Sequence, residues 1–350
     1  MWRLGVREDN SYDLMLEELR HKLKDLTPGM DILVETAQKI PGAEGGLSKR
    51  DLNTVTQDLE RVWHVLRLHR LLADFFGDEI GFGGDSILNY YYMVGVGEPP
   101  RFTFDLDASW HRRERLKRVV LARMAEFNRW LAENNLILRI PVGGGRVAEL
   151  FRVEHDVEKE HFPDILPLRM PVITRYGGEP FHRFLGIADY SLISELRMVF
   201  SETLGIKDPR IDYVRFEVGL NPEDMPWEDI TLENLFGWRV RSRVTRLEYQ
   251  LASKIRFKVA KDFGDKLGHA IHDILKAVLD LRLLSHVDAR AVSEYASPFD
   301  LGIAESNIST LLASGQRFWT SHHYTLIRRR YTLEEVIAKV REHIRKLARS

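Results

Sequence analysis

The 350-residue sequence predicts an α+β protein: a mixed β-sheet core with flanking helices, a helical N-terminal region and a helical C-terminal domain. Apolar residues recur at helical spacing over residues 48–76 and through most of residues 247–348. Between these helices, segments 101–107 and 211–220 alternate apolar and polar residues as β-strands do. Helices at both ends of the chain therefore enclose a central region that contains strands.

The composition excludes several classes of protein. No apolar run approaches the roughly 18 residues of a membrane span, and the first ten residues lack an apolar signal segment. The chain has no cysteine, which excludes disulfides, thiolate metal sites and cysteine nucleophiles. We therefore expect a cytoplasmic protein with no membrane partner.

The elements follow in order. Helices are predicted at 11–26, 32–40, 48–76, 86–94, 112–134 and 187–204, and strands at 101–107, 169–174, 211–220 and 238–243. Residues 136–141 and 147–153 should form a hairpin around the glycines at 143–145, and residues 221–237 a loop with a short helix near Leu232. The last helices are expected at 247–263, 265–285, 287–295, 303–314 and 332–348.

A glycine turn precedes a pair of aspartates. Gly83, Gly84 and Ser86 form a small, flexible turn whose backbone N–H groups could bind phosphate. Asp105 and Asp107 then share one face of a strand, where two carboxylates repel each other and usually have a cation nearby. The combination suggests a metal–nucleotide site, although a glycine hairpin followed by solvated aspartates has the same pattern.

Later segments add further charged candidates. Glu217 offers a third carboxylate on the second alternating strand, and Lys254 lies at the edge of an apolar helical face. Residues 239–261 are strongly basic and could follow a phosphate backbone. Arg101 either pairs with an aspartate or holds a nucleotide.

This order of motifs resembles the nucleotidyltransferase superfamily, with its polymerase-beta-like fold, and more specifically the AbiEii toxin family. The family's G-G-T/S-x-L turn is matched by Gly83, Gly84, Ser86 and Leu88, and its R-x-S/T-x-D-h-D strand by Arg101, Thr103, Asp105 and Asp107. Its I-K-I-D/E strand is matched by 214–218 with Glu217, and its s-L-E-x-x-L-A-x-K-h helix by Leu247, Glu248, Leu251, Ala252 and Lys254. The last motif, K-D-h-x-D-h, is met in part: Asp273 aligns, but His269 and Ala270 replace Lys and Asp. The matches cover about half the chain, in blocks, and the interval from turn to aspartates is longer than in the family.

The resemblance implies a metal-dependent nucleotidyltransferase that uses an NTP, with Mg²⁺ or Mn²⁺ held by Asp105, Asp107 and Glu217. It implies catalytic roles for Asp105, Asp107, Lys254 and Asp273, and nucleotide binding by Gly83, Gly84, Ser86, Arg101 and Lys254. Family members act as toxins of toxin–antitoxin pairs, so an RNA acceptor, the 3′ end of tRNA, and an antitoxin partner are implied. The domains would be an N-terminal helical region (1–78), a nucleotidyltransferase core (79–243) with an insertion around 146–204, and a C-terminal helical domain (244–350).

Three alternatives stay open at this point. The acceptor could be a protein or a small molecule, since the same core serves both. The altered last motif is also compatible with a module that binds an NTP or a partner without catalysis. Finally, His269, His272, Asp273 and Lys276 share one helical face, which could be interpreted as a zinc site.

Overall fold

A mixed β-sheet occupies the middle of the protein, for which a computed structural model describes residues 9–112, 114–220 and 225–349. Within these residues the sheet has eight strands, in the order β5-β6-β8-β2-β1-β10-β9, with β7 also paired to β8. The strands are β1 (Ile80–Gly83), β2 (Asp105–Trp110), β5 (Glu154–His155), β6 (Ile165–Thr174), β7 (Glu179–Pro180), β8 (Arg210–Gly219), β9 (Trp227–Glu233) and β10 (Arg239–Thr245). Since β2 is parallel to β8 and antiparallel to β1, the predicted mixed sheet is confirmed.

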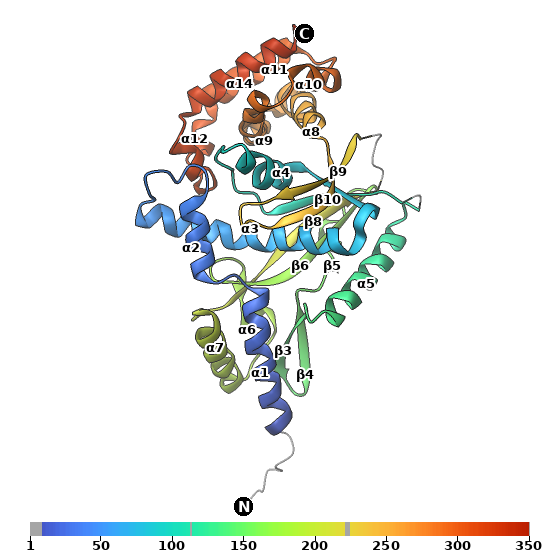
Figure 1. The fold of residues 1–350 in the computed structure, drawn as a ribbon, viewed down its shortest axis with the longest axis vertical. Coiled ribbons are helices and arrows are strands. Elements are labelled where there is room, and N and C mark those ends of the chain that lie inside the picture. Colours follow the sequence, from blue (N-terminus) through green and yellow to red (C-terminus); the bar gives the residue numbers. More distant parts are fainter. Residues whose placement is uncertain (1–8, 113, 221–224, 350) are drawn as a thin grey trace, which may run out of the picture.

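Helices cover the sheet on several sides (Figure 1). The N-terminal helices are α1 (Asp9–Leu26), α2 (Met30–Lys39) and α3 (Lys49–Phe76), followed by the short η1 (Gly77–Glu79). The helix α3 runs across the sheet and contacts β1, β2, β6, β8 and β10. The helix α4 (Gly84–Ile87) continues as the π-helix η2 (Leu88–Met93). The other helices before the C-terminal part are α5 (Lys117–Glu133), η3 (Val157–Lys159), α6 (Phe181–Phe184) and α7 (Tyr190–Leu204). The predicted hairpin is formed by β3 (Leu138–Gly143) and β4 (Arg146–Leu150).

The C-terminal part is helical, as predicted, and lies at the end of the molecule opposite α1 (Figure 1). Its elements are α8 (Leu247–Lys254), η4 (Ile255–Val259), η5 (Gly264–Lys266), α9 (Leu267–Asp280), η6 (Leu281–His286), α10 (Ala289–Ala296), α11 (Leu301–Ser314), α12 (Gln316–Trp319), η7 (His322–Tyr324), α13 (Thr325–Arg328) and α14 (Leu333–Leu347). The described helices include none both long and apolar enough to span a membrane.

The protein has two apolar cores. The N-terminal helices share one core with the sheet, in which Leu59, Leu66 and Phe82 are fully buried. The C-terminal helices form a second core, which also receives Leu88 and Met93 from η2. The helix behind the glycine turn therefore bridges the two cores, since its Tyr90 and Tyr91 belong to the core of the sheet.

The strand prediction for 101–107 was wrong at its start, because β2 begins only at Asp105. The backbone before it bonds mostly to side chains, and once to the carbonyl of His323, instead of to a neighbouring strand. The N–H of Arg101 donates to Asn89 Oδ1 (2.9 Å), and the Tyr90 hydroxyl both donates to Thr103 O and accepts from Thr103 N, each at 2.6 Å. This segment is therefore held extended without belonging to the sheet.

Two other predictions differ from the structure. The segment predicted as a loop with a short helix near Leu232 contains strand β9, which pairs with β10 over its whole length; residues 221–224 of that segment lie outside the described residues. The helix predicted to begin at 112 begins at Lys117. Before this helix, strand β2 continues to Trp110, whose indole N–H donates to the backbone carbonyl of Glu114 (3.1 Å).

Candidate functional site

The glycine turn and two of the predicted acids meet on adjacent strands. Gly83 of β1 lies opposite Asp107 of β2, and Asp107 in turn lies beside Glu217 of the parallel strand β8. Paired strands are about 4.8 Å apart. Asp105 and Asp107 are both exposed while Leu106 between them is buried, so the two aspartates share the open face.

The turn lies directly against the second aspartate. Gly84 has a φ of +73°, and a Cβ built on it would collide with the carboxylate of Asp107. A Cβ on Gly83 would also be tight, at 3.0 Å from Thr245 Oγ1. Gly84 is therefore required by a backbone that passes close to an acidic group, and Gly83 by the close approach of Thr245.

The acids interact electrostatically. The Asp107 side chain is open to solvent at one side, but the surrounding protein removes much of its hydration. This loss of hydration, with the charges of Asp105, Asp85 and Glu217, raises the pKa of Asp107 to about 7, against the opposing charge of Lys254. A cation at the same place would relieve this repulsion.

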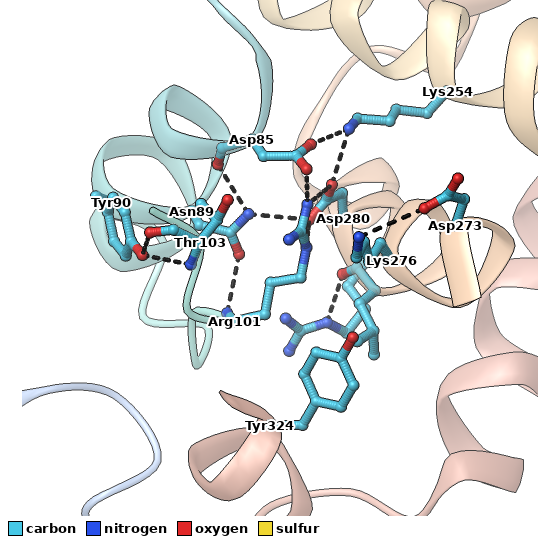
Figure 2. Close-up of polar contacts among 12 residues, drawn as sticks. Asp85, Asn89, Tyr90, Arg101, Thr103, Lys254, Asp273, Lys276, Asp280 and Tyr324 are labelled. Atoms are coloured by element: carbon cyan, nitrogen blue, oxygen red, sulfur yellow. Dashed lines mark hydrogen bonds and ion pairs between the residues drawn. The ribbon is translucent and has the colours of Figure 1, made fainter. Parts of the chain in front are cut away.

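Four charged side chains form a network behind the acids (Figure 2). Arg101 donates to Asp280 through Nε (2.9 Å) and Nη2 (3.0 Å), and it also pairs with Asp85. Lys254 pairs with Asp85, and its Nζ lies 3.1 Å from Asp280 Oδ2. Asn89 Nδ2 completes the network with a hydrogen bond to Asp280 Oδ1 (3.0 Å). The network joins the glycine turn, the segment before β2, α8 and α9.

Opposite charges in the network fix its protonation states. Burial alone would raise the pKa of Asp85, but the charges of Arg101 and Lys254 outweigh it and lower that pKa. Burial would likewise lower the pKa of Lys254, but Asp280 and Asp85 outweigh it and raise that pKa. Lys254 is thus a fixed cation beside the turn rather than a proton donor.

Two clefts adjoin the aspartates. The first has a volume of about 450 Å³ and is lined by the glycine turn, Asp107, Lys254 and Lys258, with Trp227, Tyr249 and Phe257 as its aromatic walls. The second, of about 360 Å³, is lined by Asp105 together with Arg61, Arg215, Lys276 and the rings of Phe104, Tyr213 and Tyr324. The acidic pair therefore lies between an aromatic cleft and a basic one.

Three predicted residues have surroundings other than those implied for them, although Arg101 lines the second cleft together with Asp105. Ser86 is buried and its hydroxyl donates to the backbone carbonyl of Asp105, so it holds the strand instead of facing phosphate. Arg101 is only 2% exposed and its guanidinium faces two carboxylates. Asp273 lies on the surface of α9 beside Lys276 (3.4 Å) and is not among the residues that line either cleft (Figure 2).

Acidic residues of β9 partly neutralise the positive charge of the basic segment 239–261. Arg243 of β10 pairs with Asp229 of β9 (2.9 Å), and Arg239 lies opposite Glu233. Arg241, Arg246 and Lys258 are exposed. The zinc interpretation of α9 gains no support, because the ligand atoms of His269, His272 and Asp273 do not all lie within 4.8 Å of one another in the described chain.

Asp85 and Asp280 are the site residues that sequence reasoning missed. Asp280 stands in an otherwise apolar run, from Ala277 to Leu284, with only Arg282 as a further charge. A carboxylate in such a run must be buried with a partner, and this was the available signal. Asp85 lies inside the turn motif itself, between Gly84 and Ser86, where only its neighbours were interpreted.

The acids fit a divalent metal ion in their chemistry. Carboxylate oxygens are the ligands that Mg²⁺ and Mn²⁺ prefer, and the raised pKa of Asp107 reflects an excess of negative charge at this point. In the described chain the ligand atoms of Asp105, Asp107 and Glu217 do not all lie within 4.8 Å of one another. Binding would therefore require rotation of these exposed side chains toward a common ion.

Comparison of the sequence with known proteins identifies no family for this chain. No protein-family model matches the chain, and no curated protein sequence matches it. Among solved structures, the chain is similar to MenT4, described as a nucleotidyltransferase toxin from Mycobacterium tuberculosis, with 14% sequence identity and a TM-score of 0.45 over 91% of this chain and 89% of that chain. A similarity this distant assigns no function, so the function has to be inferred from the residues of the site.

Proposed function

We propose that the protein is a metal-dependent nucleotidyltransferase, which transfers a nucleoside monophosphate from an NTP to an acceptor hydroxyl. The observation that supports this is the contact of the Gly84 turn with Asp107, with Glu217 beside it on the next strand and Asp105 on the same face. A turn of this kind offers backbone N–H groups to phosphate at the point where carboxylates can hold a cation.

The chain's own residues would bind and orient the NTP. Gly83 and Gly84 let the backbone approach the phosphates, and Lys254 adds a positive charge fixed by Asp85 and Asp280. Asp105, Asp107 and Glu217 would hold Mg²⁺ or Mn²⁺, which when bound activates the acceptor hydroxyl and neutralises charge on the triphosphate. Three further residues would position this site: Ser86 bonds to the Asp105 backbone, Asp280 pairs with Lys254, and Arg101 pairs with Asp85.

The aromatic cleft suits the nucleotide. Its rings, Trp227, Tyr249 and Phe257, provide surfaces on which a base can stack, and the glycine turn and Lys254 form its phosphate end. Phe257 is 50% exposed, which is unusual for a phenylalanine unless something covers it.

The basic cleft suits an RNA acceptor. Arg215 and Lys276 offer charges for a phosphate backbone, and Phe104 and Tyr213 offer rings for single-stranded bases. The 3′ end of tRNA is single-stranded and ends in the hydroxyl that this reaction needs. We therefore propose tRNA as the acceptor and, with the AbiEii resemblance, a toxin that is neutralised by a cognate antitoxin in the cytoplasm.

Transfer of label tests the activity. Purified protein is incubated with each α-³²P-labelled NTP, Mg²⁺ and total tRNA, and label on the RNA is measured. Asp105→Asn and Asp107→Asn should lower the rate about 1,000-fold, since several kcal/mol of transition-state stabilisation depend on the bound ions. Asp208→Asn, an exposed aspartate before β8, is the matched control and should leave the rate unchanged.

The outcomes distinguish the alternatives. Transfer that survives both substitutions would overturn the proposed site. Label on protein instead of RNA would select a protein acceptor, and tight NTP binding without transfer would indicate a non-catalytic module. Arg215→Glu should raise the KM for tRNA about tenfold without changing the KM for NTP, whereas Arg197→Glu on α7 should change neither.

A further inference from the structure

A second cluster of metal-type ligands lies away from the acids. Asp58 of α3 meets His322 and His323 of η7, and one ligand atom from each residue lies within 4.8 Å of the others. Among the described residues this is the one such group of three. It joins a helix of the N-terminal region to the C-terminal helical part.

The carboxylate of Asp58 lacks a strong cation. Its side chain is only 5% exposed, and in the described structure its hydrogen bonds and ion pairs are all with the two histidines. The nearest arginine on the same helix, Arg61, is engaged elsewhere, with Nε 3.3 Å from Asp212 and its guanidinium over the ring of Phe104. A buried carboxylate in this position requires a positive partner.

Both histidines bring a ring nitrogen to this carboxylate from η7. A neutral imidazole is the form that binds a metal ion. The His322 side chain is 61% exposed, which leaves an entry path from solvent.

The distances match a tetrahedral ion. Zinc bonds to nitrogen and oxygen of about 2.0–2.2 Å place neighbouring ligand atoms about 3.3–3.6 Å apart in a tetrahedron. Asp58 lies 3.2 Å from His323 Nδ1 and 3.8 Å from His322 Nε2. Small side-chain rotations would bring all three atoms to one ion, with a fourth position open to water.

We propose that Asp58, His322 and His323 form a binding site for a divalent transition metal of the zinc class, distinct from the Mg²⁺ site of the acids. Its ligands include nitrogen, which Mg²⁺ disfavours and Zn²⁺ prefers. The site ties η7 to α3. It also supports the segment before β2, because the His323 carbonyl accepts from the N–H of Phe102 (3.2 Å) and the His323 ring contacts Phe104.

Cobalt binding tests this site without reference to activity. The 350-residue protein is stripped with a chelator and titrated with Co²⁺, whose tetrahedral complexes absorb strongly in the visible range, and Zn²⁺ is then added in competition. We expect one equivalent of Co²⁺, displaced by Zn²⁺, and a rise in Tm on adding Zn²⁺.

His322→Ala is the main variant, because this side chain is 61% exposed and its removal leaves the apolar cores intact. It should weaken Co²⁺ binding at least about 100-fold, as expected for loss of one of three ligands. Asp58→Asn should do the same. His161→Ala, which removes an exposed histidine elsewhere, should bind like the wild type. Equal Co²⁺ affinity in the wild type and His322→Ala, or no tetrahedral spectrum at one equivalent, would overturn the proposal.

Discussion

The backbone of Gly84 lies in contact with the carboxylate of Asp107, on the neighbouring strand of the sheet. Gly84 adopts a φ of +73°, so the turn bends away from the strand immediately after this contact. The glycine turn and the acid of the proposed site are therefore parts of one small structure.

Replacement of Gly84 by alanine should abolish most of the activity. The added Cβ would displace the Asp107 carboxylate, and displacements of about 1 Å at a reacting centre lower rates about 100-fold. Gly97→Ala is a closely matched control. Gly97 has a φ of +72° and nothing within 4 Å of a built Cβ, so it carries the same backbone strain without the collision.

The measurement for this pair is the initial rate of nucleotidyl transfer, with Tm recorded for both variants. Both variants should lose about 1 kcal/mol from the left-handed backbone, and Gly84→Ala should lose more because its Cβ also meets the Asp107 carboxylate. Equal activity in Gly84→Ala and Gly97→Ala would show that the contact with Asp107 has no catalytic consequence.

Asp107→Asn should stabilise the metal-free protein at high pH. The folded-state pKa of about 7 lies above the value of about 4 in an unfolded chain, so wild-type stability falls as pH rises from 4 through 7. The neutral asparagine does not lose this stability. Because solvent reaches the carboxylate, we expect a difference of about 1 kcal/mol at pH 8 rather than the full effect of the shift.

Thermal unfolding with EDTA at pH 4.5 and pH 8, conditions chosen on either side of the transition, measures this difference. The variant's advantage should vanish at the lower pH, where both proteins are neutral at this position. At pH 8, Mg²⁺ should raise the Tm of the wild type and not that of the variant. A wild type more stable than Asp107→Asn at pH 8 without metal would contradict the raised pKa.

Arg101→Met should strongly destabilise the protein. Loss of this buried cation leaves Asp85 and Asp280 with Lys254 alone, and breaking a buried ion pair costs about 3–5 kcal/mol. Arg70→Met on α3 is the control, since its pair with Asp74 is exposed and should contribute less than about 1 kcal/mol. Urea unfolding gives both values.

A double variant tests whether the loss of stability in Arg101→Met comes from the buried charge that it leaves unpaired. Arg101→Met with Asp280→Leu removes one buried charge of each sign, so it should recover part of the loss seen in Arg101→Met. A double variant less stable than the single one would indicate that Asp280 acts mainly on Lys254.

The acids and the glycine turn of the proposed site could be predicted from the sequence, because each follows a pattern within a single element. The alternation of β2 and β8 placed Asp105, Asp107 and Glu217 on open strand faces, and the glycines marked a turn. These patterns depend on residues within one element. They needed no knowledge of which elements pack together.

The remainder depends on contacts between distant segments. Arg101 looked like a strand residue, but its backbone is bonded by Asn89 and its side chain by Asp280. Asp273 was chosen on α9 by motif spacing, whereas Asp280, two turns further along, faces the network (Figure 2). The apolar run around Asp280 indicates that this carboxylate is buried, but its partners come from distant segments, which no local pattern identifies.

The charged network also has a consequence for protein synthesis. Asp85 and Lys254 are 169 positions apart in the chain, and Arg101 and Asp280 are 179 apart. Chains emerge from the ribosome N-terminus first, and domains fold as they emerge. The turn and both acid strands are therefore made well before Lys254 and Asp280 exist to hold them. A nascent chain therefore cannot complete the network until α9 has been translated, because a product that ends before α9 lacks Asp280.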